Sequence, residues 1–141
     1  MKIDDVRKYF EGDRYLTMTG VIVEEAEDGR AVCTVDIVPE NHFNKGGVVQ
    51  GGVTYTLADC TFAVASNYSF IDRGETDRFI TVSQSANITY FSPPKGKKLI
   101  CTAEAVSRGR VSSVYRMEVK DELDTNVALM IGNGYTIELD R

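Results

Sequence analysis

The hydrophobic spacing at the start of the chain is helical. Ile3, Val6 and Phe10 recur every three or four positions, and charged residues fill most of the places between them. This spacing predicts a short amphipathic helix that ends near Gly12, within a lead-in of residues 1–14.

The spacing then changes to that of strands. Residues 16–25 are rich in Val, Ile and Thr, and residues 31–38 alternate between two faces. The dipeptide Asp28-Gly29 between these segments is typical of a tight turn, so the pair predicts a β-hairpin, and Pro39 ends its second strand.

The longest apolar stretch runs from Gly51 to about Ser69. It is too long for one strand, and its apolar residues cover most sides of a helix. It therefore predicts a central, largely buried helix. Polar loops are expected at residues 40–47 before this helix and at residues 72–78 after it.

Four segments rich in strand-forming residues complete the chain. They span residues 79–90, 99–106, 111–119 and 127–137. Short turns such as Arg108-Gly109-Arg110 separate the last three strands, which favours antiparallel pairing. The order of elements predicts an α+β fold, with one sheet on one apolar helix, in a single domain of residues 1–141.

A sheet of this kind has an edge strand whose backbone groups lack partners. Pairing of edges or helices between two copies would cover that edge. We therefore expect a homodimer, or a tetramer built from such dimers.

Charge and composition narrow the function. The 141 residues carry a net charge of −5, which argues against nucleic-acid binding because that requires a basic face. No stretch resembles a membrane span, and the N-terminus lacks the apolar core of a signal peptide. We expect a cytoplasmic protein with no nucleic-acid or membrane partner.

The cysteines and the single histidine do not form a metal-binding pattern. Cys33, Cys60 and Cys101 lie far apart, and His42 is the only histidine. We expect no metal site and three reduced thiols packed as small apolar residues. His42 is expected to be a solvated loop histidine, with contact to a substrate as the less favoured alternative.

One carboxylate lies within the long apolar segment. Asp59 is the only charged residue between Gly46 and Ile71. Burying an ionised carboxylate is costly unless it is paired, hydrogen-bonded or in contact with water. Asp59 is therefore either a structural carboxylate bonded to its neighbours or part of a functional site.

Residues near the start of the predicted helix favour a functional site. Asn44, Gln50, Gly51, Gly52 and Asp59 form the spaced set Asn-x5-Gln-Gly-Gly-x6-Asp. The first N–H groups of a helix have no partner inside it and lie at the positive end of its dipole. Beside glycines, such groups are open to a carbonyl oxygen that becomes negative during a reaction.

The carboxylate and the glycines are too far apart to act together within one chain. Asp59 lies roughly 10 Å along the helix from the glycine pair. Two antiparallel helices at a twofold interface could place Gly51 of one chain beside Asp59 of the other.

The resemblance to a known family rests on several segments. They are Asn44 to Asn67, Val82-Ser83, Asn87-Ile88-Thr89-Tyr90-Phe91-Ser92-Pro93, the Arg108-Gly109-Arg110 region and Gly132-x-Gly134. Over roughly residues 16–138 the sequence resembles the hotdog-fold acyl-CoA thioesterases of the phenylacetate-pathway (PaaI-like) type. The resemblance implies a hotdog fold, an antiparallel sheet wrapped around one long central helix, with an active site shared by two subunits.

The resemblance also implies a role for each site residue. Asp59 would attack the thioester carbonyl, directly as a nucleophile or through water as a general base. The Gly51 N–H would hold the carbonyl oxygen, with Gly52 beside the substrate. Asn44 would bind or orient the substrate or the attacking water, and the Ser83 hydroxyl would assist from the facing strand. An acyl- or aryl-CoA would be hydrolysed without a cofactor, since coenzyme A is part of the substrate.

Gln50 departs from the family pattern, which usually has His before the glycine pair. Gln donates and accepts hydrogen bonds but does not titrate near neutral pH. If the family's His only orients and hydrogen-bonds, Gln50 can replace it; if that His must carry a proton, this chain would be slow or inactive. Gln50 therefore keeps open a second hypothesis, a module that binds or senses CoA thioesters without hydrolysing them. A hotdog-fold dehydratase is a less favoured third, because those enzymes generally need a His.

Basic residues are candidates for holding the phosphates of coenzyme A. The local cluster comprises Lys95, Lys97, Lys98, Arg108 and Arg110. Arg108 and Arg110 are the first choice because they flank one turn and can converge on one anion. A solvated set of turn charges is the alternative. No aromatic residue is assigned to substrate, because core packing accounts for most aromatics in a domain of this size.

Overall fold

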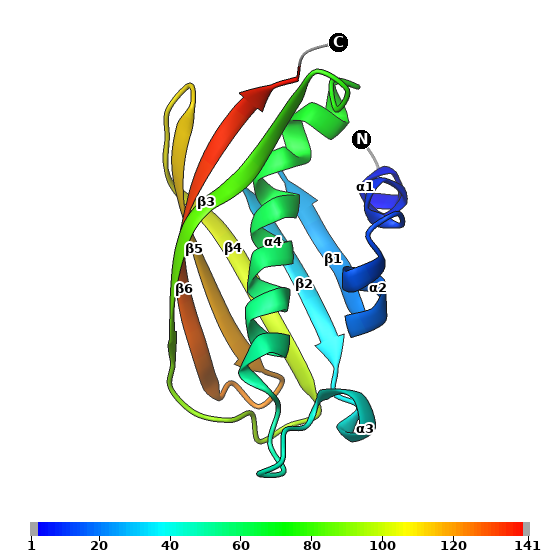
Figure 1. Ribbon diagram of the computed structural model, residues 1–141, viewed down its shortest axis with the longest axis vertical. Coiled ribbons are helices and arrows are strands. Elements are labelled where there is room, and N and C mark those ends of the chain that lie inside the picture. Colours follow the sequence, from blue (N-terminus) through cyan, green and yellow to red (C-terminus); the bar gives the residue numbers. More distant parts are fainter. Residues whose placement is uncertain (1–2, 140–141) are drawn as a thin grey trace.

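A six-stranded antiparallel sheet curves around one long helix, α4, in a computed structural model that describes residues 3–139 (Figure 1). The helices are α1 (Ile3–Phe10), α2 (Arg14–Thr19), α3 (Pro39–His42) and α4 (Gly51–Asp72). The strands are β1 (Val21–Glu27), β2 (Arg30–Asp36), β3 (Phe79–Tyr90), β4 (Lys98–Arg108), β5 (Ser112–Asp121) and β6 (Asn126–Glu138). The predicted α+β architecture is confirmed.

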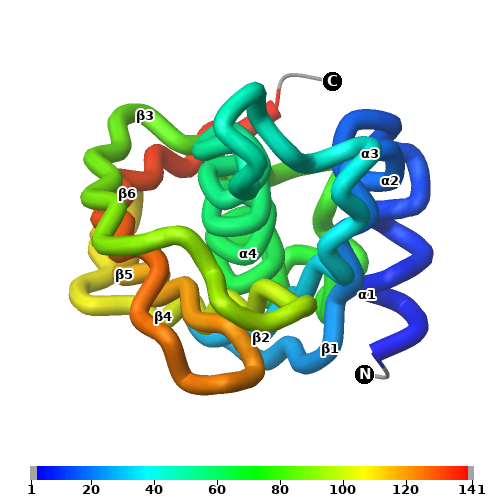
Figure 2. The backbone as a smooth tube through the Cα atoms, turned by 90° about the horizontal axis from the view of Figure 1, so that it is seen from below, coloured from blue at the N-terminus to red at the C-terminus, as the bar shows by residue number. Residues whose placement is uncertain are grey.

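The strand order in the sheet is β1-β2-β4-β5-β6-β3. Tight turns join β1 to β2, β4 to β5 and β5 to β6, and each of these pairs is antiparallel as predicted. Strand β3 lies at the far edge, next to β6, so the chain crosses the end of the sheet before β4 begins (Figure 2).

Helix α4 lies on the concave face of the sheet because it carries apolar residues on most of its surface. Leu57, Thr61 and Val64 are fully buried, and the Thr61 hydroxyl donates to the Leu57 carbonyl at 2.6 Å. Completely burying a side chain such as Leu57 contributes about 2 kcal/mol. Near the end of α4, the Asn67 side chain donates to the Thr81 carbonyl and accepts from the Thr81 N–H, at 3.0 and 2.9 Å. These two bonds fix the start of β3 against the helix.

Residues 16–19 were predicted to start a strand, and that prediction is wrong: they belong to α2. The Asp13 carboxylate caps this helix by accepting from the Leu16 N–H at 3.0 Å, and Gly20 ends it with a φ of 89°. The hydroxyl of Thr17 bonds to a carbonyl four residues earlier, at 2.9 Å. A carboxylate cap and a left-handed glycine outweigh the strand preference of Thr here.

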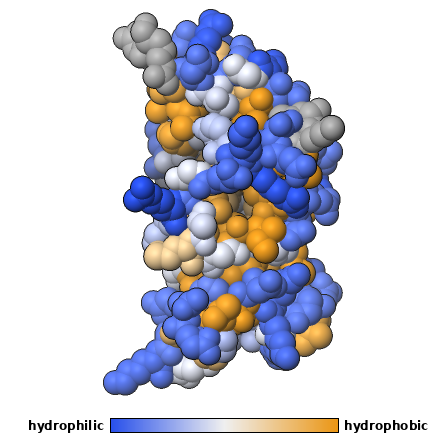
Figure 3. Space-filling view, turned by 90° about the vertical axis from the view of Figure 1, so that its right-hand side faces the viewer, coloured by the Kyte–Doolittle hydropathy of each residue, from blue (hydrophilic) through white to orange (hydrophobic). Residues whose placement is uncertain are grey.

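The face formed by α1 and α2 shows why α2 was hard to recognise. Hydrophobic patches lie among hydrophilic ones on this side of the molecule (Figure 3). Tyr15 and Met18 of α2 are exposed, so the helix presents apolar side chains outward as well as inward. Without an apolar stripe on one side, helical periodicity is weak.

Other boundaries shift by a few residues. Strand β2 ends at Asp36, and Pro39 is the first residue of the short helix α3 inside a region predicted as loop. Helix α4 continues to Asp72, past the expected end near Ser69. None of the helices within residues 3–139 is long and apolar enough to cross a membrane.

Candidate active site

The start of α4 presents unbonded backbone N–H groups. Gln50 is the N-cap residue in an extended conformation, and its carbonyl accepts from the Val53 N–H at 3.0 Å. Within residues 3–139, the N–H groups of Gly51 and Gly52 donate no hydrogen bond, as the start of a helix predicts. The Gln50 side chain is exposed and makes no capping bond.

Asn44 organises the turn that leads into α4. Its side-chain oxygen accepts from the Gly46 N–H at 2.9 Å and from the Val48 N–H at 3.4 Å. The Asn44 N–H in turn donates to the Val48 carbonyl at 2.7 Å. Because the side-chain oxygen is used inside the turn, the Nδ2 amide of Asn44 is the group left for a substrate.

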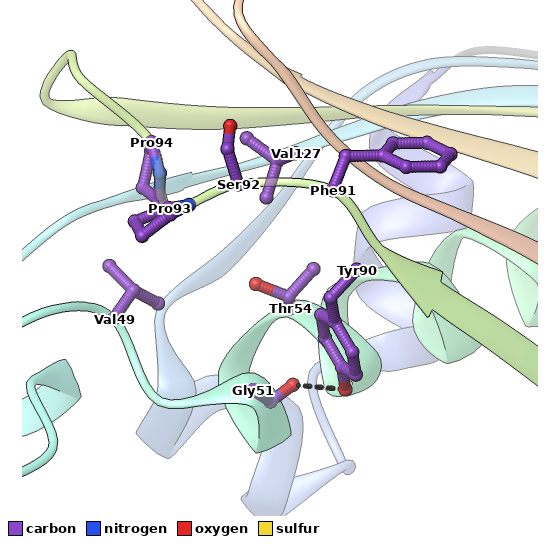
Figure 4. Close-up of a pocket in the computed structure, with 9 residues that line it drawn as sticks. All are labelled: Val49, Gly51, Thr54, Tyr90, Phe91, Ser92, Pro93, Pro94 and Val127. Carbon is purple, nitrogen blue, oxygen red and sulfur yellow. Dashed lines mark hydrogen bonds between the residues drawn. The ribbon is translucent and has the colours of Figure 1, made fainter.

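Gly51 is closely covered by an aromatic ring from the end of β3. The Tyr90 hydroxyl donates to the Gly51 carbonyl at 2.9 Å (Figure 4). A Cβ atom at position 51 would lie only 3.2 Å from Cζ of the Tyr90 ring. Glycine at position 51 is therefore what lets β3 approach the helix start.

An apolar cavity of about 300 Å³ lies beside Gly51. Its lining contains no charged side chain and consists of Val49, Gly51, Thr54, Tyr90, Phe91, Ser92, Pro93, Pro94 and Val127 (Figure 4). Tyr90 and Phe91 had not been assigned to a site from the sequence. Their position at the end of a predicted strand, directly before Ser92-Pro93-Pro94, was the only indication that they leave the core.

Asp59 lies on the side of α4 that the sheet does not cover, and we call this side the open face. The open face consists of residues that recur every three or four positions and are all at least partly exposed: Gly52, Thr56, Asp59, Ala63 and Ser66. Apart from Asp59 these residues are small. In Figure 1 no element lies in front of the middle of α4.

The environment of Asp59 disfavours its charge. No side chain or backbone group of residues 3–139 donates a hydrogen bond to its carboxylate. Burial raises the pKa of Asp59 above its ordinary value, and the negative charge of Asp13 raises it further. A structural carboxylate bonded to its neighbours is therefore not what the structure contains.

Ser83 points to the same side of the sheet as α4. It pairs with Gly134 in the β3–β6 ladder, and paired residues share a face. A Cβ atom on Gly134 would meet Phe62 of α4 at 3.1 Å, so this face is the concave one. The Ser83 side chain is exposed there.

Arg108 and Arg110 are brought together, far from the helix start. They line one cavity of about 250 Å³ with Ser66, Ser69, Phe70, Thr81, Gly109, Ser113, Tyr115 and Thr136. Arg108 also pairs with Asp28 at 2.7 Å, with both side chains partly exposed. Ser66 is separated from Gly51 by roughly 22 Å along α4.

His42 is buried, so the prediction of a solvated histidine is wrong. Its ring is 4% exposed, accepts at Nδ1 from the Val38 N–H and donates from Nε2 to the Thr19 carbonyl. Sequence reasoning missed this because Thr19 lies 23 positions away in the chain. The cysteines follow the prediction: Cys33, Cys60 and Cys101 are free and buried in the core.

Comparisons with known proteins identify the family. The family model described as "Thioesterase superfamily" matches residues 46–128. A protein of Archaeoglobus fulgidus, provisionally named as an esterase, is 31% identical over 140 residues, which are 98% of this chain and 85% of that protein. Acyl-coenzyme A thioesterase PaaI of Escherichia coli is 26% identical over 129 residues, with 91% and 86% covered.

The fold agrees with these matches. The structure of the E. coli PaaI protein, from the phenylacetic acid degradation operon, superposes with a TM-score of 0.81 and 23% identity, covering 96% of this chain and 92% of that one. The matched region contains α4, the glycine pair, Asp59 and Ser83. The chain belongs to the thioesterase superfamily, and it is a PaaI-like thioesterase with the hotdog fold.

Proposed function

We propose that the protein hydrolyses acyl-CoA thioesters to a free acid and coenzyme A, at a site shared by two copies of the chain. The name of the E. coli relative, an acyl-coenzyme A thioesterase, supports this substrate class.

The observation that carries the proposal is the state of Asp59. A partly exposed carboxylate that accepts no hydrogen bond from residues 3–139 does not stabilise the protomer, and its raised pKa brings it closer to that of an effective general base. A carboxylate in this state fits a role in chemistry better than a role in folding.

The distance within one protomer explains why a second copy is needed. Asp59 and Gly51 are roughly 12 Å apart along α4, so they cannot meet at one carbonyl carbon. Antiparallel packing of two open faces would place Gly51 of one protomer beside Asp59 of its partner. The small residues Gly52 and Thr56 lie within the stretch where the two helices would meet, beside the exposed ring of Tyr55.

The sheet offers an interface in the same assembly. Strand β3 is an edge strand of 12 residues, whereas the other edge strand, β1, has 7 residues and receives the Arg7 side chain on its Val23 carbonyl. A long uncovered edge is a template for pairing with a second copy. We expect the resulting dimer to pair β3 with β3, and a tetramer would add contacts elsewhere.

The reaction follows from these positions. The Asp59 carboxylate takes a proton from a water molecule as its oxygen attacks the thioester carbon. The Gly51 N–H donates to the resulting oxyanion, which is the step where such donors contribute most. The C–S bond then breaks, the carbonyl re-forms, and the thiolate of coenzyme A leaves and takes up the proton held by Asp59.

The two ends of the substrate require different surroundings. The charge-free cavity beside Gly51 suits an apolar acyl or aryl group. Arg108 and Arg110, among hydroxyl groups, suit the phosphates of coenzyme A. Since Ser66 follows Asp59 by roughly 10 Å along α4, the arginine cavity would lie beyond the carboxylate, on the same protomer.

The remaining polar groups would orient the substrate. The exposed Gln50 side chain can hydrogen-bond to the thioester region but transfers no proton near neutral pH. The free amide of Asn44 and the hydroxyl of Ser83 would bind the carbonyl or the attacking water. No step in this scheme needs a titrating group at position 50.

Release of free thiol from a panel of acyl- and aryl-CoAs tests the proposal. We expect turnover by the wild type and a loss of roughly 100-fold or more in kcat for Asp59→Ala, because a general base contributes about that much. Activity that survives Asp59→Ala would exclude the role given to this residue.

Gln50 favours one alternative, a module that binds CoA thioesters without hydrolysing them. Tight binding of an acyl-CoA by the wild type without thiol release would support that alternative. Gln50→His would then be the informative variant, since gain of turnover would identify the missing proton carrier.

A further inference from the structure

We propose that His42 is a positioning residue that holds the backbone in front of α4 and so aims the N–H groups of Gly51 and Gly52 at the substrate. Its catalytic consequence rests on the proposed function. Its geometry stands independently of that function.

The His42 ring joins two segments that are distant in sequence. Val38 N–H donates to Nδ1 at 2.9 Å, so Nδ1 carries no proton and the ring is the neutral tautomer with its proton on Nε2. Nε2 donates to the Thr19 carbonyl at the end of α2, at 2.8 Å. The ring is buried and therefore ties α3 to α2 through bonds that water does not replace.

The backbone of His42 then reaches the first turn of α4. Its carbonyl accepts from the Gln50 N–H at 2.8 Å. This bond closes a loop of residues 42–50. Within the loop, Phe43 and Val49 form an antiparallel bridge, and the Asn44 N–H donates to the Val48 carbonyl at 2.7 Å. His42 therefore anchors both ends of the loop that carries Asn44.

The anchor matters because the helix starts with two glycines. Glycine has the largest backbone freedom, and helix ends fray, so Gly51 and Gly52 do not orient their own N–H groups. The Gln50 N–H is bonded to the His42 carbonyl, and the next two N–H groups donate to nothing in the described residues 3–139. The bond at Gln50 holds the free pair from the preceding residue, and the Tyr90 hydroxyl on the Gly51 carbonyl holds it from the other side.

His42 cannot replace the histidine that Gln50 lacks. Both ring nitrogens are engaged, and the side chain is 4% exposed. It therefore acts through the backbone and touches no substrate.

Three substitutions at position 42 separate the two ring bonds. His42→Phe keeps a ring and removes both bonds, His42→Asn offers an acceptor near Nδ1, and His42→Gln offers a donor near Nε2. We expect kcat for acyl-CoA hydrolysis to fall roughly 10- to 100-fold in His42→Phe, with a smaller change in KM, because misplaced oxyanion donors act on the transition state. His42→Asn and His42→Gln should recover part of kcat.

Val6→Ala is the matched control for lost stability. Val6 is fully buried in α1, which lies beside the upper half of the molecule in Figure 1, whereas α4 begins in the lower half. We expect this variant to unfold more easily with kcat unchanged. A loss of kcat in Val6→Ala equal to that in His42→Phe, or no loss in any His42 variant, would overturn the proposal.

Amide hydrogen exchange gives a measurement that needs no activity. In the wild type, the Gln50 amide should exchange slowly and the Gly51 and Gly52 amides quickly; in the His42 variants that fold, exchange at Gln50 should accelerate. Fast exchange at Gln50 in the wild type would refute the anchor even if no variant folds. If the wild type releases no thiol while Gln50 is protected, the proposed function fails and the anchor stands.

Discussion

At the scale of single residues, two features of its surroundings disfavour the ionised form of Asp59. It is partly buried without a hydrogen-bond donor among residues 3–139, and it lies near the carboxylate of Asp13, so its pKa is raised. A raised pKa means that the folded protein holds the proton more tightly than the unfolded chain does. The ionised carboxylate therefore lowers the stability of the protomer, a cost that is common where residues serve function.

Asp59→Asn should accordingly stabilise the protein while abolishing turnover. We expect a higher midpoint of urea unfolding than the wild type at a pH above the raised pKa of Asp59. Because protonation removes the same cost, the difference should shrink as the pH falls through the pKa of Asp59. Urea titrations at a series of pH values measure this directly.

The control removes an exposed negative charge from the same acidic chain. Asp36→Asn, in β2, changes the net charge of −5 by the same amount. Equal stabilisation by Asp36→Asn and Asp59→Asn would mean that overall charge, and not the surroundings of Asp59, explains the effect.

At the scale of elements, the connection between β3 and β4 depends on one buried carboxylate. Asp121 accepts from the N–H groups of Lys95 and Gly96 through one oxygen, and from those of Leu123 and Thr125 through the other, at 2.7 to 3.0 Å. Burial alone would raise the pKa of Asp121, but the bonds from Thr125, Gly96 and Lys95 outweigh burial and hold it well below its ordinary value. The connection includes Pro93 and Pro94, which line the apolar cavity.

Asp121→Asn should destabilise the fold because the Asn side chain has one accepting oxygen, whereas both carboxylate oxygens of Asp121 accept backbone hydrogen bonds. We expect the free energy of unfolding at pH 7 to fall by roughly 2 kcal/mol, the contribution of a hydrogen bond to a charged group. Because the pKa of Asp121 is lowered by folding, its carboxylate stabilises the fold above the pKa of the unfolded chain, and this stabilisation is lost in acid. The free energies of unfolding of the wild type and Asp121→Asn should therefore converge as the pH falls below about 4.

Asp124 in the same turn provides the comparison. It is exposed, has a φ of 65° and pairs with Lys120 at 3.2 Å. Asn adopts this conformation readily, and exposed pairs contribute little, so Asp124→Asn should change stability by less than about 0.5 kcal/mol. Equal effects of the two substitutions would contradict the account of Asp121.

At the scale of the whole molecule, an active site built from two protomers can be tested by mixing inactive chains. Chains with Asp59→Asn lack the carboxylate and should be inactive alone. Chains with Gly51→Ala keep the backbone N–H, but the added methyl group would lie 3.2 Å from Cζ of the Tyr90 ring, so we expect the displaced helix start to be inactive alone as well. In a mixed dimer, one of the two sites receives an unchanged Gly51 and an unchanged Asp59. Unfolding and refolding equal amounts together should restore about one quarter of wild-type activity, because half of the dimers are mixed and each has one intact site.

The opposite result would be equally clear. If both residues acted within one protomer, no site in a mixed dimer would be repaired, and activity would stay at the level of the separate variants. Sedimentation of the mixture would establish that dimers had formed.

Much of this molecule could be predicted from sequence because the signals are local. Periodicity located the long helix and all four later strands, and the glycine pair, Asn44 and Asp59 stood out by spacing and by lack of charge around them. Helix α2 was missed because its apolar residues do not lie on one side, and its caps, Asp13 and Gly20, decide the conformation.

The amino-acid sequence by itself determined the long helix and the four later strands, that one apolar helix must be covered by the sheet, and which residues could carry chemistry. Only the tertiary structure decided that Asp59 lies on the open face, that Tyr90 covers Gly51 and that His42 is buried against Thr19. Those facts depend on packing between segments far apart in the chain. Periodicity reports which side of an element is apolar, but it does not report which neighbour that side meets.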